Sequence, residues 1–302
     1  MAKIRFDENE DLINICYDNV FKAVFTRNTP ESQGALSRLV SALIGRTVTV
    51  VTVTANEPAT ENLHERRIRF DIACKTEHHE PVNIEMSLNP TPYEPVRMEY
   101  YIGKLFTSQD IHGKDKDYND LKEAYQIAFL VKERFFADDS FFHTFAYYDP
   151  ERGISLNGKS RIITLELSKL DKVVEKPTAA MTAAELWAVY FRYLQDAGKR
   201  QKINEILEHE EGIAMASEVL MTISRDEAER ARLLSEFKGE LDYRTHVNYA
   251  KKKGREEGRQ EGRQEGREEG QKEIALKLKA MGLSVEQIAQ GTGLSKEQVE
   301  AL

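Results

Sequence analysis

The chain has 302 residues, of which 40% are hydrophobic and 31% are charged, so it can bury one large core or two smaller ones. Its formal net charge of −8 argues against nucleic-acid binding over the whole surface, and any such binding must come from a local patch or a bound cation. The two cysteines, Cys16 and Cys74, offer neither a disulfide framework nor zinc-site spacing. No apolar run approaches the roughly 18 residues of a membrane span, and the first residues lack a signal-peptide pattern. We therefore expect a cytoplasmic protein.

The first half of the chain predicts helices and strands in alternation. A helix is predicted over residues 29–45, because Thr29 can cap it and Pro30 suits its first position. The next segments predict three strands, a helix, a fourth strand and two further strands. The predicted bounds are 47–54, 66–75 and 82–88 for the three strands, 93–112 for the helix, and 125–132, 141–148 and 161–167 for the later strands. This order indicates an α/β core.

The second and third strands of this core carry an acidic pair. Apolar and polar residues alternate in both strands, so each is expected to bury one face only. Phe70 and Ile72 fall on the buried face of the second strand and Asp71 on the other, while Glu85 has the equivalent position in the third strand. His78 lies midway between the two acids, in a loop that we expect to be an exposed turn.

A hairpin symmetric about His78 would set Asp71 directly opposite Glu85. Directly opposed side chains have Cβ atoms about 5 Å apart, where two negative charges repel each other. Two carboxyl groups at that distance either share a proton or bind a cation, and Mg²⁺ takes carboxylate oxygens as ligands. A metal-bound water with a lowered pKa could then attack a phosphodiester. The alternative is that both acids are solvated on an exposed sheet face, paired with Arg69 and Lys75.

Residues 182–249 predict a helical region. Its apolar residues recur at helical spacing in three groups, which we expect to pack against the α/β core or against one another. The groups are Leu186, Val189, Tyr190, Tyr193 and Leu194; Ile203, Ile206 and Leu207; and Val219, Leu220 and Ile223.

Glycine then recurs every fourth residue from Gly254 to Gly270. On a helix this spacing places the glycines on one stripe, and each costs about 1 kcal/mol relative to alanine. Arginine and glutamate also recur four residues apart, so one helix carries like-charge neighbours. Two copies side by side could set arginine stripes against glutamate stripes while the glycines allow close approach. This predicts a linker helix over residues 251–273 that forms a homodimer, with a flexible solvated spacer as the alternative.

Residues 274–302 predict a small module that resembles a helix-turn-helix. Ser284 with Gln287 and Ser295 with Gln298 form capping-box patterns, and a Gly-Thr-Gly turn separates the two predicted helices. The final helix has one lysine against two glutamates, whereas a helix that reads DNA is normally more basic. DNA and a protein partner both stay open as targets of this module.

The order and spacing of these segments resemble the PD-(D/E)XK nuclease superfamily and, within it, the Rpn family of recombination-promoting nucleases, also called PD-(D/E)XK family transposases. The matching segments are YDNVFKAVF (17–25), SRLVSALIG (37–45), RIRFDIAC (67–74), VNIEMS (82–87), the helix that carries Arg97, Tyr100 and Tyr101, YQIAFL (125–130) and the glycine-rich tail. The resemblance implies a restriction-endonuclease-like core in the order αβββαβ. The implied division is a core over 1–180, a helical region over 181–250 packed on it, the linker helix and the C-terminal module.

The resemblance also implies an activity, the hydrolysis of phosphodiester bonds by a DNA endonuclease that depends on Mg²⁺, with Mn²⁺ as the other candidate ion. Asp71 and Glu85 would be the metal-binding carboxylates, and Ser87 would occupy the third catalytic position. The superfamily prefers lysine at that position and this family usually has glutamine. A serine hydroxyl is shorter and neutral, so it cannot stabilise a developing anion as an ammonium group would.

Three further residues receive roles from the resemblance. Lys22 and Arg97 would contact DNA, and Asp18, which opens the family's D-x-x-F-K pattern together with Lys22, would be an accessory residue. From the sequence alone, Arg97 could equally brace an acid or lie on the surface. The alternative function is a catalytically weakened protein of the same fold that binds DNA or a protein partner without cleaving. A third is an interaction protein built around the tail.

Overall fold

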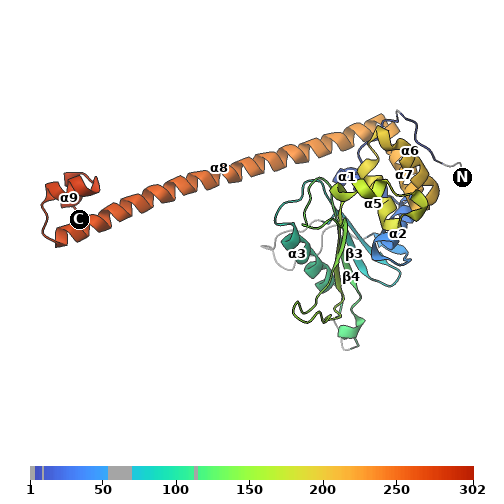
Figure 1. Cartoon of the computed structure of the whole chain (residues 1–302), viewed down its shortest axis with the longest axis horizontal. Coiled ribbons are helices and arrows are strands. Elements are labelled where there is room, and N and C mark those ends of the chain that lie inside the picture. The colour runs from blue at the N-terminus through green and yellow to red at the C-terminus, as the bar shows by residue number, and fades with distance from the viewer. Residues whose placement is uncertain (1–3, 9, 54–69, 112–114) are drawn as a thin grey trace. The chain divides into compact units, whose positions relative to one another are not determined.

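The computed structural model describes residues 4–8, 10–53, 70–111 and 115–302, and these form a six-stranded mixed sheet flanked by helices (Figure 1). The helices are α1 (Asp18–Phe25), α2 (Pro30–Ile44), α3 (Glu94–Thr107), α4 (Asp171–Val174), α5 (Ala183–Tyr193), α6 (Arg200–His209), α7 (Glu211–Arg225), α8 (Glu227–Ala280), α9 (Val285–Thr292) and α10 (Lys296–Glu300). The strands are β1 (Val50–Val53), β2 (Ile72–Thr76), β3 (Pro81–Ser87), β4 (Ala124–Leu130), β5 (Phe142–Phe145) and β6 (Ser160–Glu166). The predicted order of helix, three strands, helix and strand is confirmed, with α1 added before it.

The sheet has the strand order β1-β2-β3-β4-β6-β5. Its centre is parallel, because β3 pairs with β4 and β4 with β6 in the same direction, while the outer strands are antiparallel. In the β2–β3 hairpin Ile72 pairs with Ile84 and Ala73 with Asn83. This register is symmetric about His78, as predicted, and its extension by one residue sets Asp71 opposite Glu85.

Helices cover both faces of the sheet. One face packs on α1, α2 and α5–α7 around a large core that includes Phe21 and Trp187, and the other packs on α3 (Figure 1). The expectation that residues 82–88 bury only one face is therefore wrong: β3 is buried from Pro81 to Met86 because strands flank it on both sides and helices cover both its faces.

The residue before the acidic pair is also placed differently from the prediction. Phe70 packs against Ala73, Ile102 and Leu105 on the α3 side rather than with Ile72. Phe70 lies just outside the β2 ladder, so strict alternation of faces does not extend to it. Residues 66–69 of the predicted strand lie outside the described residues.

Helix ends follow their local chemistry. The Thr29 hydroxyl accepts a hydrogen bond from the Ser32 backbone N–H, and α2 stops at Gly45, whose φ of 83° suits glycine. The helix predicted over 93–112 ends already at Thr107, and Gln109 beyond it bonds to Lys122 instead.

The chain forms two compact units, Met1–Phe237 and Lys238–Leu302, and α8 contributes to both. In the second unit α9 and α10 begin at the two predicted capping boxes, and Ala275, Ile288, Leu294 and Val299 form a small core. The helix-turn-helix interpretation and the proposed division into four segments stay predictions. None of the helices in the described part of the chain combines the length and apolarity needed to cross a membrane.

Candidate active site at the β2–β3 hairpin

The structure brings the two predicted acids together. Asp71 directly precedes β2, and its backbone N–H donates to Glu85 Oε1 at 3.1 Å. In return, the backbone N–H of Met86 donates to Asp71 Oδ2 at 3.0 Å. Each carboxyl group is thus bonded to the backbone of the other strand. This exchange holds the two acids side by side.

Glu85 is deeply buried, with 5% of its surface exposed, and the Asp71 side chain is 14% exposed. Burial raises the pKa of Glu85, and the nearby charge of Asp71 raises it further, to about 8. In the absence of a cation, Glu85 therefore keeps its proton near neutral pH. The alternative of two solvated acids on an exposed sheet face is wrong for Glu85.

A lysine from outside the hairpin reaches this pair. Lys22 Nζ on α1 lies 2.9 Å from Asp71 Oδ1 and 3.9 Å from Asp18 Oδ2. Asp18, Lys22 and Asp71, all predicted site residues, therefore lie close together, with Asp18 and Lys22 one helical turn apart on α1. The ammonium group offsets part of the negative charge of the site.

Arg97 lies on the opposite side of the sheet, on α3. Its guanidinium pairs with the buried Glu94 and stacks on the Tyr101 ring, 5.6 Å from the centroid. Burial alone would lower the pKa of Arg97, but attraction to Glu94 and then to Glu85 raises it instead. Arg97 thus braces an acid, one of the roles left open by the sequence, and its side chain is still 41% exposed.

Ser87 lies two residues beyond Glu85 and therefore on the same face of β3. It is half-buried at the end of the strand, next to Leu130 of β4. The carboxyl ends of β3, β4 and β6 meet along this edge, where α/β sheets commonly bind ligands. The third predicted position thus shares a strand face with Glu85, two residues away.

Two buried amides were not anticipated from the sequence. Asn83 Nδ2 donates to Glu85 Oε1 at 3.0 Å and to Gln126 Oε1 at 2.7 Å, and both amide side chains are fully buried. Asn83 Oδ1 is buried and has no partner within the described part of the chain. The sequence signal that could have revealed them is a polar residue within each of the largely apolar strands β3 and β4, since a buried amide needs a hydrogen-bond partner.

These residues fit a divalent cation. Asp71 and Glu85 offer adjacent carboxylate oxygens, the donors that Mg²⁺ and Mn²⁺ prefer. The buried Asn83 Oδ1 adds an oxygen acceptor on the same strand as Glu85.

A second group of potential ligands has a different explanation. Ligand atoms of Asp138, His143 and Glu166 lie within 4.8 Å of one another. However, Lys169, whose side chain is 1% exposed, places its ammonium 2.5 Å from Glu166 Oε1 and 3.2 Å from Asp138 Oδ1. The lysine already occupies the position of a cation, so we interpret this cluster as an internal ion pair.

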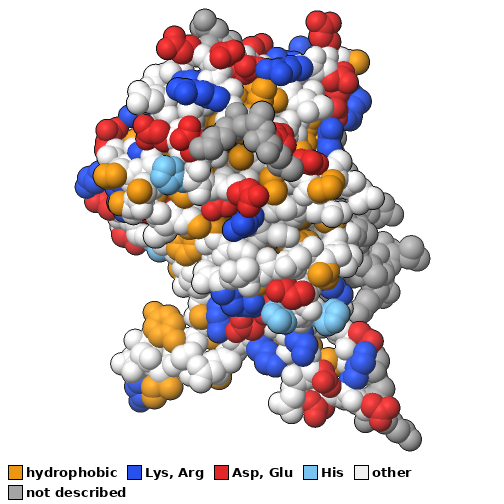
Figure 2. Space-filling view, turned by 90° about the vertical axis from the view of Figure 1, so that its right-hand side faces the viewer, with side chains coloured by type: hydrophobic (Ala, Val, Ile, Leu, Met, Phe, Trp, Pro, Cys, Tyr) orange, Lys and Arg blue, Asp and Glu red, His pale blue; other side chains and the backbone are white. Residues whose placement is uncertain are grey.

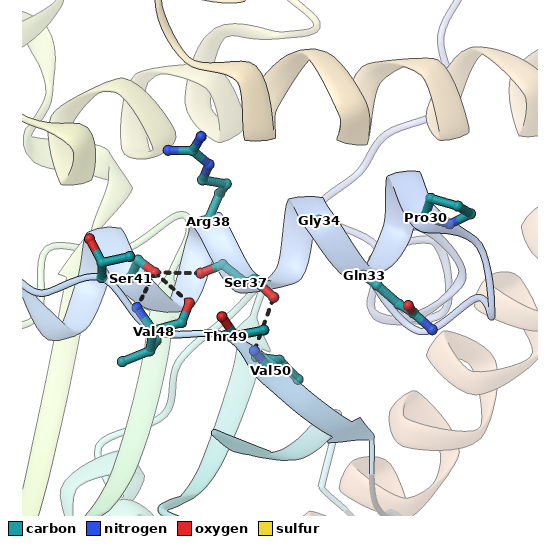
Figure 3. A pocket seen from close by; sticks show the side chains of 10 residues that line it. Pro30, Gln33, Gly34, Ser37, Arg38, Ser41, Val48, Thr49 and Val50 are labelled. Carbon is teal, nitrogen blue, oxygen red and sulfur yellow. Dashed lines mark hydrogen bonds between the residues drawn. The ribbon is translucent and has the colours of Figure 1, made fainter. Parts of the chain in front are cut away.

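A hollow of about 550 Å³ lies between α2 and β1 (Figure 3). Its two serine hydroxyl groups hold the local structure, because Ser41 Oγ accepts from the Val48 backbone N–H and Ser37 Oγ accepts from that of Val50. Arg38, also in its lining, pairs with Glu211. These contacts tie β1 to α2, and the hollow contains none of the predicted site residues.

One of three comparisons with known proteins found a match. The family profile described as PD-(D/E)XK nuclease family transposase matches residues 15–250, which include every predicted site residue. No curated protein and no solved structure matches the chain. The profile covers the α/β core, the helical region and part of α8, so the chain belongs to the PD-(D/E)XK nuclease family transposases.

Proposed function

We propose that this protein is a Mg²⁺-dependent DNA endonuclease of the recombination-promoting type, with Asp71 and Glu85 as the metal ligands. The observation that carries the proposal is the pair of carboxyl groups, fixed side by side because Glu85 accepts a hydrogen bond from the backbone N–H of Asp71 and Asp71 accepts one from the backbone N–H of Met86. Two free, buried cysteines support the proposed reducing, cytoplasmic setting.

The proposed reaction is the hydrolysis of a phosphodiester. A water oxygen bonds to phosphorus and the bond from phosphorus to one sugar oxygen breaks; the water loses a proton and the leaving oxygen gains one. Asp71 and Glu85 would hold a divalent ion, which when bound would supply a water of lowered pKa and neutralise charge on the phosphate. Asn83 orients Glu85 through its amide, and Ser87 offers a hydroxyl two residues further along the same face of β3.

DNA contact is proposed to be local. Acidic and basic side chains are interspersed over the face shown in Figure 2, in keeping with the net charge of −8. Lys22 is close to the acids and Arg97 is partly exposed on α3, so each offers a cation to a phosphate near the cleavage point. This arrangement predicts weak binding along a duplex outside the site.

Ser87 favours a second candidate, a protein of this fold that binds DNA or a partner without cleaving. The test is nicking of supercoiled plasmid by the purified full chain in Mg²⁺, in Mn²⁺ and with chelator. Nicking that disappears with chelator and in both Asp71→Ala and Glu85→Ala supports the endonuclease. The exposed, ion-paired Glu175 provides the control, because Glu175→Ala removes a carboxylate remote from the site. A folded wild type that never nicks, yet shifts DNA in a gel, supports the second candidate.

For the C-terminal half we propose self-association through residues 251–273. The described side chains of this stretch are almost all exposed, and a Cβ added at any of its glycines would meet no other atom within 4 Å. An isolated helix with glycine at every fourth position is weak in water, and a second copy would stabilise it. Sedimentation equilibrium of the full chain tests this proposal.

A further inference from the structure

The third catalytic position carries no charge in this chain. Ser87 is neutral, whereas a phosphoryl oxygen that gains charge during hydrolysis is best stabilised by a cation in a fixed place. Lys22, which follows the buried Phe21 on α1, brings its ammonium to 2.9 Å from Asp71. A cation therefore stands beside the acids, supplied by a different element of the fold.

The position of this lysine is imposed by the core. The Phe21 ring lies 4.9 Å from that of Phe25, 6.2 Å from Phe129 of β4 and 5.9 Å from Phe191 of α5. All four aromatic side chains are almost completely buried. Because α1 is anchored on this aromatic cluster, the stem of Lys22 starts from a fixed point, and its ammonium stays within reach of the acids.

We propose that Lys22 is the catalytic lysine of this site and replaces the one missing at position 87. Its side chain is 21% exposed, so the ammonium can turn from Asp71 to a non-bridging oxygen of a phosphate bound at the acids. Charge-assisted hydrogen bonds of this kind are among the strongest available to a phosphate. The inference rests on the proposed endonuclease function and identifies the residue that lets the enzyme work with serine at position 87.

The competing explanation is that Lys22 is only a counter-ion for Asp71. The two explanations differ in what a charge moved to position 87 achieves. If Lys22 acts on the phosphate, a lysine at position 87 compensates for its loss. If Lys22 is only a counter-ion, its removal leaves cleavage intact, because a bound metal would neutralise Asp71 instead.

The experiment compares wild type with Lys22→Met, Ser87→Lys and the double variant, in the full chain. Lys199→Met is the matched control, because Lys199 is likewise ion-paired, to Glu175, but remote from the acids. Mn²⁺ affinity is measured by electron paramagnetic resonance without DNA, and plasmid nicking is measured in Mn²⁺. Lys22→Gln retains a donor to Asp71 and replaces Lys22→Met if that variant does not fold.

We expect Lys22→Met to bind Mn²⁺ at least as tightly as wild type and to nick about 10²–10³-fold more slowly, the usual cost of one such stabilising group. The double variant should recover at least tenfold. Nicking by Lys22→Met within threefold of wild type would overturn the inference and leave the endonuclease standing. Plasmid nicking by Ser87→Lys but not by wild type would also overturn the inference. If neither protein nicks the plasmid, both the endonuclease function and the inference are refuted.

Discussion

Glu85→Gln should stabilise the metal-free protein increasingly as the pH rises from mildly acidic to neutral. Glutamine keeps the size of the side chain and an oxygen that can accept the bonds of Asp71 N–H and Asn83 Nδ2. It removes only the proton equilibrium. The raised pKa of Glu85 means that the folded protein holds a proton that the unfolded chain releases near pH 4.5. Stability contributed by this carboxyl group is therefore complete below that pH and is lost as the pH rises toward 8.

The size of the effect follows from proton linkage. Between about pH 5 and about pH 7 the folded state keeps nearly one more proton than the unfolded state, and each pH unit costs about 1.4 kcal/mol. Wild type should thus lose about 2–3 kcal/mol of unfolding free energy relative to Glu85→Gln over this range. For a unit of this size that corresponds to about 5–10 °C in Tm.

The assay is thermal and urea unfolding of both proteins at a series of pH values, with chelator present throughout. Glu175→Gln serves as the control, because Glu175 is exposed and paired with Lys199, which lowers its pKa. The difference between wild type and this control should stay nearly constant with pH. A wild-type minus Glu85→Gln difference that is equally flat would refute the assignment of a retained proton to Glu85.

Three further results are expected. First, metal binding to wild type near pH 7 should release about one proton per ion, because Glu85 must ionise to bind. Calorimetry in buffers of different ionisation enthalpy measures this release, and a binding heat that is the same in every buffer would contradict it. Second, Gly212→Ala should lower the free energy of unfolding in urea by about 1–3 kcal/mol, because the new Cβ would overlap Cβ and Cγ of Arg38. Gly103 has open space around it, so Gly103→Ala should be neutral or stabilising by up to about 1 kcal/mol. Gly262→Ala should make an isolated α8 peptide more helical yet weaken self-association of the full chain; unchanged sedimentation would contradict close approach at the glycines.

The features predicted correctly from the sequence are those that local chemistry decides. The cap at Thr29, the end of the helix near Gly45 and the hairpin register about His78 each depend on a few neighbouring residues. That register alone placed Asp71 opposite Glu85. The two capping boxes at the end of the chain are likewise local and are present as predicted.

The parts that could not be predicted depend on packing between distant segments. The alternation of apolar and polar residues in β3 indicates that the strand has two different faces. It does not reveal that both faces are buried, since this depends on α1 and α3, which cover the sheet from opposite sides. The pairing of Lys22 with Asp71 joins residues far apart in the sequence through the position of α1 on the core. The Asn83–Gln126 amide pair depends on which strand lies beside β3, and no short pattern encodes that neighbour.

The acidic and the basic groups of the site are held by different elements of the fold. Both carboxyl groups come from one hairpin, 14 residues apart, and the hydrogen bonds that they accept from facing backbone N–H groups fix their separation. The ammonium of Lys22 and the guanidinium of Arg97 reach in from helices on opposite faces of that sheet. In the proposed endonuclease, a phosphate that draws either cation toward itself would therefore alter the electrostatic balance of the pair, while the distance between the acids stayed the same.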